Sequence, residues 1–311
     1  MTNEELEKLK SDAESGDAFS QCELGYHYIE NEDYEKALFW YRKAAEQDYG
    51  MGLYNVGLCY EYGEGVEKNL ETAVEYYHKA AQQGDADAQC MLGCYYGEGT
   101  KNPDFEKSFF WFQKSAEQGN LNAKFNLSSC YEYGEGVKRD RKKANALLLE
   151  VAAAGYPLAQ YYVAFYYRKG RYGFPKDLKK AFSWYRKSAM GGDEDAQIEL
   201  ARLYDSEKNY KKALYWYRRA AKQGNIDAVS NLGYFYSEGL GVEKDYKRAN
   251  KYFFKAAEQG DEVAMYNLGN SYESGEGVEK DIQKAIEWYE KAAALGDKDA
   301  DKALKRLKEN K

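Results

Sequence analysis

Apolar and small residues recur along the chain at the spacing of helices, in a unit that repeats many times. In one copy of the unit, Ala264, Leu268 and Tyr272 follow one another at intervals of four residues, so they share one face of a helix. Trp288 and Ala292 mark a second helix in the same way. Each unit is therefore predicted to be a pair of helices.

Two landmarks recur in register and count these units. The first is a leucine or valine followed by a small residue, with a tyrosine four residues later. It occurs 32 to 37 residues apart at Leu24, Val56, Leu92, Leu127, Val163, Leu200, Leu232 and Leu268. The second is a small residue followed by alanine, as at Ala292 and Ala293. A fixed period of roughly 20 to 50 residues is typical of stacked repeats. The sequence thus predicts eight repeats instead of the two domains that 311 residues would otherwise suggest.

Glycines mark the ends of the predicted helices. Gly-Glu-Gly-Val separates the two helices of a unit at 63–66, 134–137 and 275–278, where glycine tolerates positive φ. Gly-Asp ends several units, with Gly as a helix stop and Asp as the next N-cap. We expect repeats at 17–49, 50–84, 85–119, 120–155, 156–192, 193–224, 225–260 and 261–296. Capping helices are expected at 1–16 and 297–311, since a terminal repeat would otherwise expose its stacking face.

The aromatic content follows largely from this repetition. The chain has 32 Tyr, 13 Phe and 5 Trp. All five tryptophans, Trp40, Trp111, Trp184, Trp216 and Trp288, occupy one repeat position. We interpret them as repeated core, and the small residue after each leucine as a close contact between helices.

Charge and composition narrow the class of partner. The net charge is −7, with both signs mixed along the chain, which disfavours nucleic acid as a partner. No apolar run has the length of a transmembrane helix, and the first residues do not resemble a secretory signal. Five cysteines are an odd number, which favours a reducing compartment. We expect a cytoplasmic protein, with a monomer favoured; a mature exported form stays open.

The pattern A-x-x-x-L-G-x-x-Y followed by G-x-G-V-x-x-D-x-x-K-A-x-x-W-Y-x-K-A-A-x-x-G-D, seen in 264–297, resembles the Sel-one-like repeat, a relative of the tetratricopeptide repeat. The resemblance implies an all-α fold, a right-handed α-solenoid of about eight helix-turn-helix repeats with capping helices at both ends. It also implies first helices that line the concave face, and an adaptor or scaffold that binds proteins. Some cysteine-rich relatives bind or hydrolyse β-lactams, but they carry Cys at the Ala-Ala position, where this chain has none.

If first helices line the groove, the residues two before and two after each leucine are expected to be exposed there. These positions are rich in aromatic residues, which dominate binding energies. The candidates are Tyr26, Tyr54, Leu58, Cys90, Cys94, Phe125, Tyr161, Phe165, Arg202, Tyr234, Tyr266 and Asn270; the same positions hold Cys22, Ser129, Ile198 and Ser230. The alternative is that these side chains pack helix against helix, because interfaces and cores share residue types.

Four asparagines immediately precede the leucine or valine of the first landmark: Asn55, Asn126, Asn231 and Asn267. An amide has both donors and an acceptor, so these side chains could hold the backbone of a bound peptide. The alternative is a hydrogen bond within the chain.

No catalytic residue, cofactor site or metal site is predicted. Cys90 and Cys94 could form half a metal site or a redox pair, but without further ligands they are interpreted as small hydrophobic residues. His27 and His78 lie at unrelated repeat positions, which gives no support for a catalytic triad. The leading hypothesis is a non-enzymatic scaffold or adaptor that binds a protein or peptide in its groove. The alternatives are a β-lactam-binding or hydrolysing protein and an exported host-interaction factor.

Overall fold

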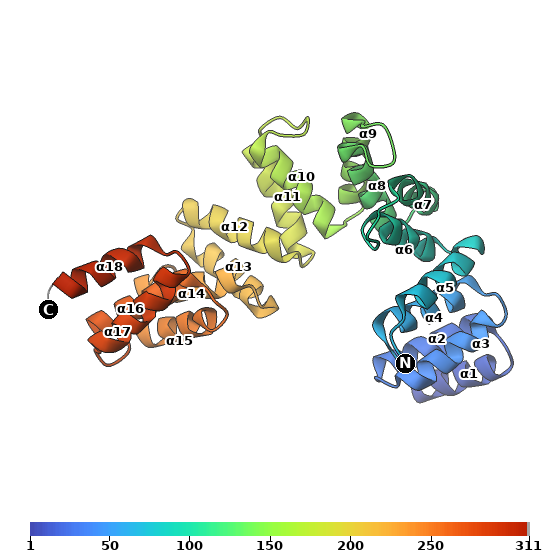
Figure 1. The fold of residues 1–311 in the computed structure, drawn as a ribbon, viewed down its shortest axis with the longest axis horizontal. Helices are drawn as coiled ribbons and strands as arrows, with labels where there is room; N and C mark the ends of the chain where they lie inside the picture. Colours follow the sequence, from blue (N-terminus) through green and yellow to red (C-terminus); the bar gives the residue numbers. More distant parts are fainter. Residues whose placement is uncertain (310–311) are drawn as a thin grey trace. The chain divides into compact units, whose positions relative to one another are not determined.

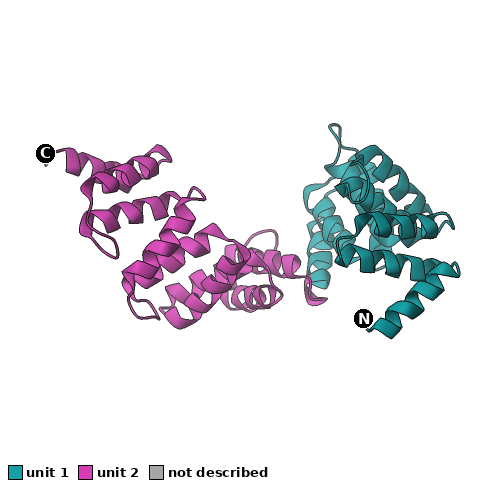
Figure 2. Cartoon of the chain, turned by 90° about the horizontal axis from the view of Figure 1, so that it is seen from below, with its two compact units in different colours: residues 1–151 teal, residues 152–311 magenta. Residues whose placement is uncertain are grey.

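The computed structural model describes residues 1–309, which contain eighteen α-helices and no strand (Figure 1). The all-α solenoid fold of helix-turn-helix repeats predicted from the sequence is confirmed. The chain divides into two compact units, residues 1–151 and 152–311 (Figure 2). The end of the predicted C-terminal capping helix, at 310 and 311, lies outside the described residues.

Unit 1 begins with the single helix α1 (Asn3–Glu14), followed by helix pairs in which the even-numbered helix comes first. These are α2 (Ala18–Glu30) and α3 (Tyr34–Ala45), α4 (Gly50–Tyr62) and α5 (Leu70–Gln82), α6 (Ala86–Gly97) and α7 (Phe105–Glu117), and α8 (Leu121–Tyr133) and α9 (Arg141–Ala153). Helix α9 ends just past the boundary of the unit. First helices of neighbouring repeats also touch, as α2 touches α4.

Unit 2 continues the same alternation. Its pairs are α10 (Pro157–Lys169) and α11 (Leu178–Met190), α12 (Glu194–Ser206) and α13 (Tyr210–Gln223), α14 (Ile226–Glu238) and α15 (Tyr246–Ala257), and α16 (Glu262–Ser274) and α17 (Ile282–Ala294). Helix α18 (Lys298–Glu309) packs on the last pair.

One backbone hydrogen bond closes the loop inside every repeat. The N–H of the residue that caps the second helix donates to the carbonyl of the landmark tyrosine at 2.8–2.9 Å, as from Asp281 to Tyr272. The Asp281 carboxylate accepts from the N–H of Lys284 at 3.0 Å, which satisfies a free donor of the helix start. The Lys284 ammonium lies 5.5 Å from the centre of the Tyr272 ring. The recurring Tyr, Asp and Lys are therefore parts of one loop closure.

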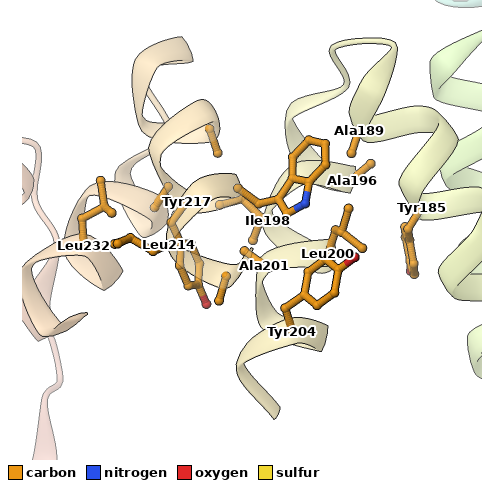
Figure 3. Close-up of a cluster of buried hydrophobic side chains, with 14 of the residues drawn as sticks. Tyr185, Ala189, Ala196, Ile198, Leu200, Ala201, Tyr204, Leu214, Tyr217 and Leu232 are labelled. Atoms are coloured by element: carbon orange, nitrogen blue, oxygen red, sulfur yellow. The ribbon is translucent and has the colours of Figure 1, made fainter. Parts of the chain in front are cut away.

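In seven of the eight repeats, the small residue after the leucine or valine of the first landmark packs with an aromatic ring of the second helix; the exception is the repeat of Ser128, which has Leu148 there. A Cβ on Gly269 would overlap the ring of Tyr289, and the same holds at the four other glycines of this position. Where alanine replaces glycine, as at Ala201, it shares a buried cluster with Tyr217 (Figure 3). These buried rings follow the tryptophan position directly: Tyr41, Tyr77, Phe112, Tyr185, Tyr217, Phe253 and Tyr289.

The interpretation of the tryptophans as repeated core holds only in part: Trp111, Trp184 and Trp288 pack against buried clusters without being buried themselves. Trp40, Trp111, Trp184 and Trp288 are half-buried, and Trp216 alone of the five is buried. Neighbouring positions on a helix point about 100° apart. The ring that packs on Gly269 therefore belongs to Tyr289, and Trp288 lies at the edge of the core.

Buried glutamines join successive repeats. The side-chain Nε2 of Gln197 donates to the carbonyl of Ala189 at 3.2 Å, and its Oε1 accepts from Nε2 of Gln223 at 3.0 Å. Gln89 makes the same pair of bonds with Ala81 and Gln118. The glutamine thus adds a hydrogen bond to a carbonyl at a helix end, which also accepts from a backbone N–H just beyond the helix, that of Gly192 for Ala189 and that of Gly84 for Ala81.

Candidate functional site

All sixteen candidate residues lie on first helices, but their exposure differs. Tyr26, Cys94, Arg202 and Tyr234 are exposed, and Cys90 is buried. The half-buried candidates are Tyr54, Asn55, Leu58, Phe125, Asn126, Tyr161, Phe165, Asn231, Tyr266, Asn267 and Asn270. The expectation of exposure is wrong at Cys90, which packs in an apolar cluster between α6, α7 and α8. Cys22, Ile198 and Ser230, at the same repeat position, are buried as well.

Three candidate tyrosines pack on the core of their own repeat. The ring centres of Tyr54 and Tyr77 are 5.8 Å apart, and Tyr161 and Tyr185 are separated by the same distance. Tyr266 lies 5.7 Å from Tyr289 in the same tilted arrangement. One edge of each ring therefore belongs to the helix pair, and only the remainder is open to a partner.

Four candidates come together in one pocket of unit 2. Arg202 of α12, Asn231 and Tyr234 of α14, and Asn267 of α16 line a pocket of about 340 Å³. Asp227, Ser230, Asp261 and Val263 complete its wall. Its volume lies within the range of roughly 300–1,000 Å³ that is usual for binding sites.

Ion pairs and hydrogen bonds hold most of the polar groups of this pocket. Nη2 of Arg202 lies 2.8 Å from Oδ2 of Asp227, and Nη1 lies 3.5 Å from Oε1 of Glu199. Nδ2 of Asn231 donates to the backbone carbonyl of Asp227 at 2.7 Å. The guanidinium and the Asn231 amide are thereby fixed in place before anything binds.

On the other wall of the pocket, Ser230 and Asp261 are paired with each other, whereas the side-chain amide of Asn267 has no partner in the described part of the chain. The Ser230 hydroxyl donates to Oδ1 of Asp261 at 3.0 Å. Within residues 1–309, the side-chain amide of Asn267 makes no hydrogen bond. Tyr234 is 47% exposed and Val263 is 49% exposed. The pocket therefore combines a free amide with two open apolar surfaces.

The candidates of unit 1 include a pair of thiols. Nδ2 of Asn126 lies 3.8 Å from Sγ of Cys94, and a hydrogen bond from the Cys90 thiol lowers the pKa of Cys94. That hydrogen bond, together with burial, raises the pKa of Cys90. All five cysteines are free thiols. No group of His, Cys, Asp or Glu within residues 1–309 is arranged to hold a metal ion.

His78 and His27 both pack against aromatic side chains, and His78 also forms a hydrogen bond. Nε2 of His78 lies 3.0 Å from the hydroxyl of Tyr96, with the Trp111 ring on the edge of the imidazole. Burial is the main reason that the pKa of His78 is lowered. His27 packs beside Tyr28. His78 is thus a partner of the landmark tyrosine.

Sequence reasoning missed the acidic residues of the pocket. Asp227 lies five residues before Leu232, outside the positions two before and two after the leucine, and Asp261 is the N-cap of α16. The position five residues before the leucine is one helical turn from the candidate position Ser230. Reading that position in each repeat would have pointed to Asp227.

This architecture defines an α-solenoid protein that presents a polar pocket on the first helices of unit 2. Among the described helices, none combines the length and apolar character needed to cross a bilayer. The chain belongs to the Sel1 repeat family, whose sequence model matches residues 18–49, 50–85, 86–120, 121–156, 157–193, 194–225, 226–261 and 263–297. Proteins with Sel1 repeats generally mediate protein–protein interaction.

Two solved structures and two curated proteins illustrate the likeness. A protective antigen of uropathogenic Escherichia coli with this fold has a TM-score of 0.79 and 37% identity, over 97% of this chain and 67% of that one. A Sel1 repeat protein from Oxalobacter formigenes has a TM-score of 0.65 and 31% identity, over 98% of this chain and 92% of that one. The DAP3-binding cell death enhancer 1 of Rattus norvegicus is 30% identical over 44% of this chain. An uncharacterized protein of Neisseria meningitidis serogroup B is 30% identical over 64% of it. The chain spans 34% and 40% of the length of these two curated relatives.

Proposed function

We propose that the chain is a non-enzymatic adaptor, and that the pocket formed by α12, α14 and α16 binds an extended polypeptide segment of a partner protein. The observation that carries this proposal is the free side-chain amide of Asn267, which lies in one pocket with the exposed ring of Tyr234. An amide can donate to and accept from a peptide backbone at the same time. A neighbouring aromatic ring adds apolar contact area.

The fixed polar groups would set the register of the bound segment. Arg202 is held by Asp227 and Glu199, so its remaining N–H groups are directed without further ordering. Preorganised contacts of this kind reduce the entropy that binding costs. A segment whose carbonyl groups meet Asn267 and Arg202 while an apolar side chain covers Tyr234 fits this chemistry.

The names of relatives support an adaptor role. One relative is described as DAP3-binding and another, from Saccharomyces cerevisiae, as a chitin synthase regulator. The first description names a binding partner, and the second names an enzyme that is regulated. The likeness to a protective antigen supports a second candidate, in which the same surface of an exported form meets a host protein.

Site-specific photo-crosslinking tests the proposal. A photoreactive phenylalanine analogue replaces Tyr234, and a control carries it at Tyr215, an exposed aromatic of α13 outside the pocket. We expect a crosslinked peptide from the source-cell extract at position 234 only, and its yield to fall at least fivefold when Asn267→Ala is added. Equal yields at 234 and 215, with both proteins folded by circular dichroism, would contradict the proposal. The same crosslinking is carried out once with a cytosolic extract and once with intact host cells. A crosslink in the cytosolic extract supports the adaptor, and a crosslink on the intact cells supports the exported form.

A further inference from the structure

One repeat lacks the aromatic ring that all the others carry at the tryptophan position. Seven second helices have an aromatic residue there: Trp40, Tyr76, Trp111, Trp184, Trp216, Tyr252 and Trp288. Helix α9 has Leu147 instead. Beside it lies a pocket of about 390 Å³ between α7, α8 and α9, all in unit 1 and labelled together in Figure 1. The missing ring thus coincides with open space.

The pocket has an apolar floor and a charged rim. Ala116, Leu127 and Leu147 provide aliphatic surface, and the ring of Tyr131 forms part of the wall. These four side chains belong to one apolar cluster. The rim carries Glu117, Lys124, Lys143 and Glu150. A ligand that fits must therefore be apolar at its centre and charged at its edge.

Two other repeats show how a ring sits at this position. Tyr76 stacks on the landmark residue Tyr60 at 5.8 Å between ring centres and 15° between planes. Tyr252 stacks on Tyr236 at 5.6 Å and 10°. Tyr131 is the landmark tyrosine of the repeat that contains α9. It therefore has the place of Tyr60 and Tyr236 without their stacked ring.

At one position of the rim, three residues after the tryptophan position, the charge of the side chain is opposite to that in the other repeats. The residue three positions after the aromatic is Lys or Arg in all seven: Lys43, Lys79, Lys114, Lys187, Arg219, Lys255 and Lys291. Lys187 lies 4.1 Å from the centre of Trp184, and Lys291 lies 4.0 Å from that of Trp288. The equivalent residue of α9 is Glu150. This repeat thus lacks both the ring and the cation that accompanies it.

The two lysines of this rim are already engaged. Nζ of Lys124 lies 2.6 Å from Oε1 of Glu150, and Nζ of Lys143 lies 5.2 Å from the centre of the Tyr131 ring. Glu117 forms no ion pair within residues 1–309 and only accepts a hydrogen bond from Gln113 at 3.1 Å. Of the four rim charges, Lys124 and Glu150 neutralise each other and Lys143 lies over a ring, so among the described residues of the rim Glu117 alone has neither an ion pair nor a ring contact. Its carboxylate is therefore the rim group that complements a cationic group.

We propose that this pocket binds an aromatic side chain of a partner polypeptide that carries a basic residue next to it. The ring stacks on Tyr131 in the place that Tyr76 and Tyr252 take in their own repeats. The basic group lies between Glu117 and Glu150, in the place of the missing lysine. This site is independent of the pocket in unit 2 and of the function proposed for it.

Peptides of defined charge test the proposal on the full chain. The probes are acetylated tripeptide amides Lys-Trp-Lys, Glu-Trp-Glu and Lys-Ala-Lys, with 5-fluorotryptophan where Trp occurs, measured by fluorine NMR or calorimetry. We expect Lys-Trp-Lys to bind at least tenfold more tightly than either of the others. Binding of Glu-Trp-Glu as tight as that of Lys-Trp-Lys would overturn the charge assignment. Free indole that binds as tightly as Lys-Trp-Lys would overturn the assignment to a polypeptide.

Two variants locate the binding. Leu147→Trp supplies the missing ring from the chain itself, and we expect it to weaken Lys-Trp-Lys binding at least tenfold while the melting temperature stays equal or rises. Glu150→Lys, at an exposed position, is expected to remove the preference for Lys-Trp-Lys over Glu-Trp-Glu. Tyr234→Ala, in the other pocket, serves as the control and leaves binding unchanged. Unchanged binding by folded Leu147→Trp would overturn the proposal.

Discussion

The hydroxyl of Tyr289, on the second helix of the last repeat, lies within hydrogen-bond distance of two acceptors on the first helix of the same repeat: Oε2 of Glu273 at 2.8 Å and Oδ1 of Asn270 at 2.7 Å. Tyr77 makes the same bond to Glu61 at 2.5 Å in another repeat. A hydrogen bond to a charged acceptor contributes about 1.5–3 kcal/mol. The repeated Tyr–Glu pair therefore contributes directly to the stability of a helix pair.

Removal of the Tyr289 hydroxyl tests this contribution. We expect Tyr289→Phe to lower the free energy of unfolding by about 1–2 kcal/mol, because Glu273 keeps its ion pair with Arg306 at 2.7 Å. Tyr215→Phe, on an exposed ring, is the control and should change it by less than about 0.5 kcal/mol. Urea denaturation followed by circular dichroism measures both. Equal effects of the two variants would contradict the role of the pair.

The repeat that contains α8 and α9 departs from this pattern at two of three linked positions and keeps the glutamate at the third. Leu148 stands where Tyr289 stands in the last repeat, Ser128 where Gly269 does, and Glu132 where Glu273 does. Glu132 is buried and its Oε1 accepts no hydrogen bond, with Arg139 and Arg141 at 3.7 and 3.6 Å. The carboxylate has thus lost its tyrosine donor.

A double-mutant cycle tests this linkage. Leu148→Tyr alone is expected to cost about 1–3 kcal/mol through overpacking against Ser128, and Ser128→Gly alone about 0.5–1 kcal/mol through lower helix propensity. Together they recreate the ring, the space and the donor for Glu132. We expect a favourable coupling of about 1–3 kcal/mol in chemical denaturation. Simple additivity of the two effects would show that the positions are not linked.

Buried tyrosines make the fold sensitive to alkaline pH. Burial raises the pKa of Tyr217 to about 12, above the value of 10 for an unperturbed tyrosine. The folded state then holds this proton more tightly than the unfolded state, so unfolding releases a proton between pH 10 and 12 and stability falls as pH rises through that range. Below pH 10 the contribution is fully present.

The effect of Tyr217 is measured as the change in unfolding free energy between pH 9 and pH 11.5. The wild type is expected to lose about 2 kcal/mol more of its unfolding free energy over this interval than Tyr217→Phe does. Tyr215→Phe provides the exposed control and should follow the wild type. A parallel loss in wild type and Tyr217→Phe would contradict the assignment.

The cysteines are expected to differ in reactivity. The Cys94 side chain is exposed and its pKa is lowered by the hydrogen bond from Cys90, whereas burial raises the pKa of Cys22, Cys59 and Cys130 to about 12. Because the thiolate is the nucleophile, iodoacetamide at pH 8 should modify Cys94 first, as measured by peptide mass spectrometry.

Replacement of the donor provides the control for this experiment. Cys90→Ala removes the hydrogen bond and is expected to slow modification of Cys94 several-fold, while Cys94→Ser leaves the remaining thiols largely unmodified in the folded protein. Modification of Cys130 at the rate of Cys94 would contradict the prediction.

The sequence alone predicts the helix pairs well, because their determinants are local. The spacing from Leu268 to Tyr272 defines a helix face, and Asp281 marks the start of the next helix. The ring that fills the core was not predicted correctly, since Trp288 and Tyr289 are adjacent aromatics. Spacing along one helix does not determine which of two neighbours faces Gly269.

The candidate site was predicted only in part, because its wall comes from three helices. Spacing selected Asn231 and Tyr234 on one helix and Asn267 on another. It did not identify Asp261, which lies at a helix cap, or show that Cys90 points into an apolar cluster. Both depend on how separate helices rotate against each other, and that rotation is set by packing.

The hydrogen bond that closes each loop keeps nearly the same length although the loops differ in their number of residues. The cap follows the landmark tyrosine by five residues after Tyr28 and by ten after Tyr167, yet the N–H to carbonyl distance is 2.9 Å in both. Each doubling of a flexible loop costs only about 0.6 kcal/mol in closure entropy. These loops are therefore suited to carry inserted sequence, such as an epitope or a metal-binding tag, without a change in the register of the repeats.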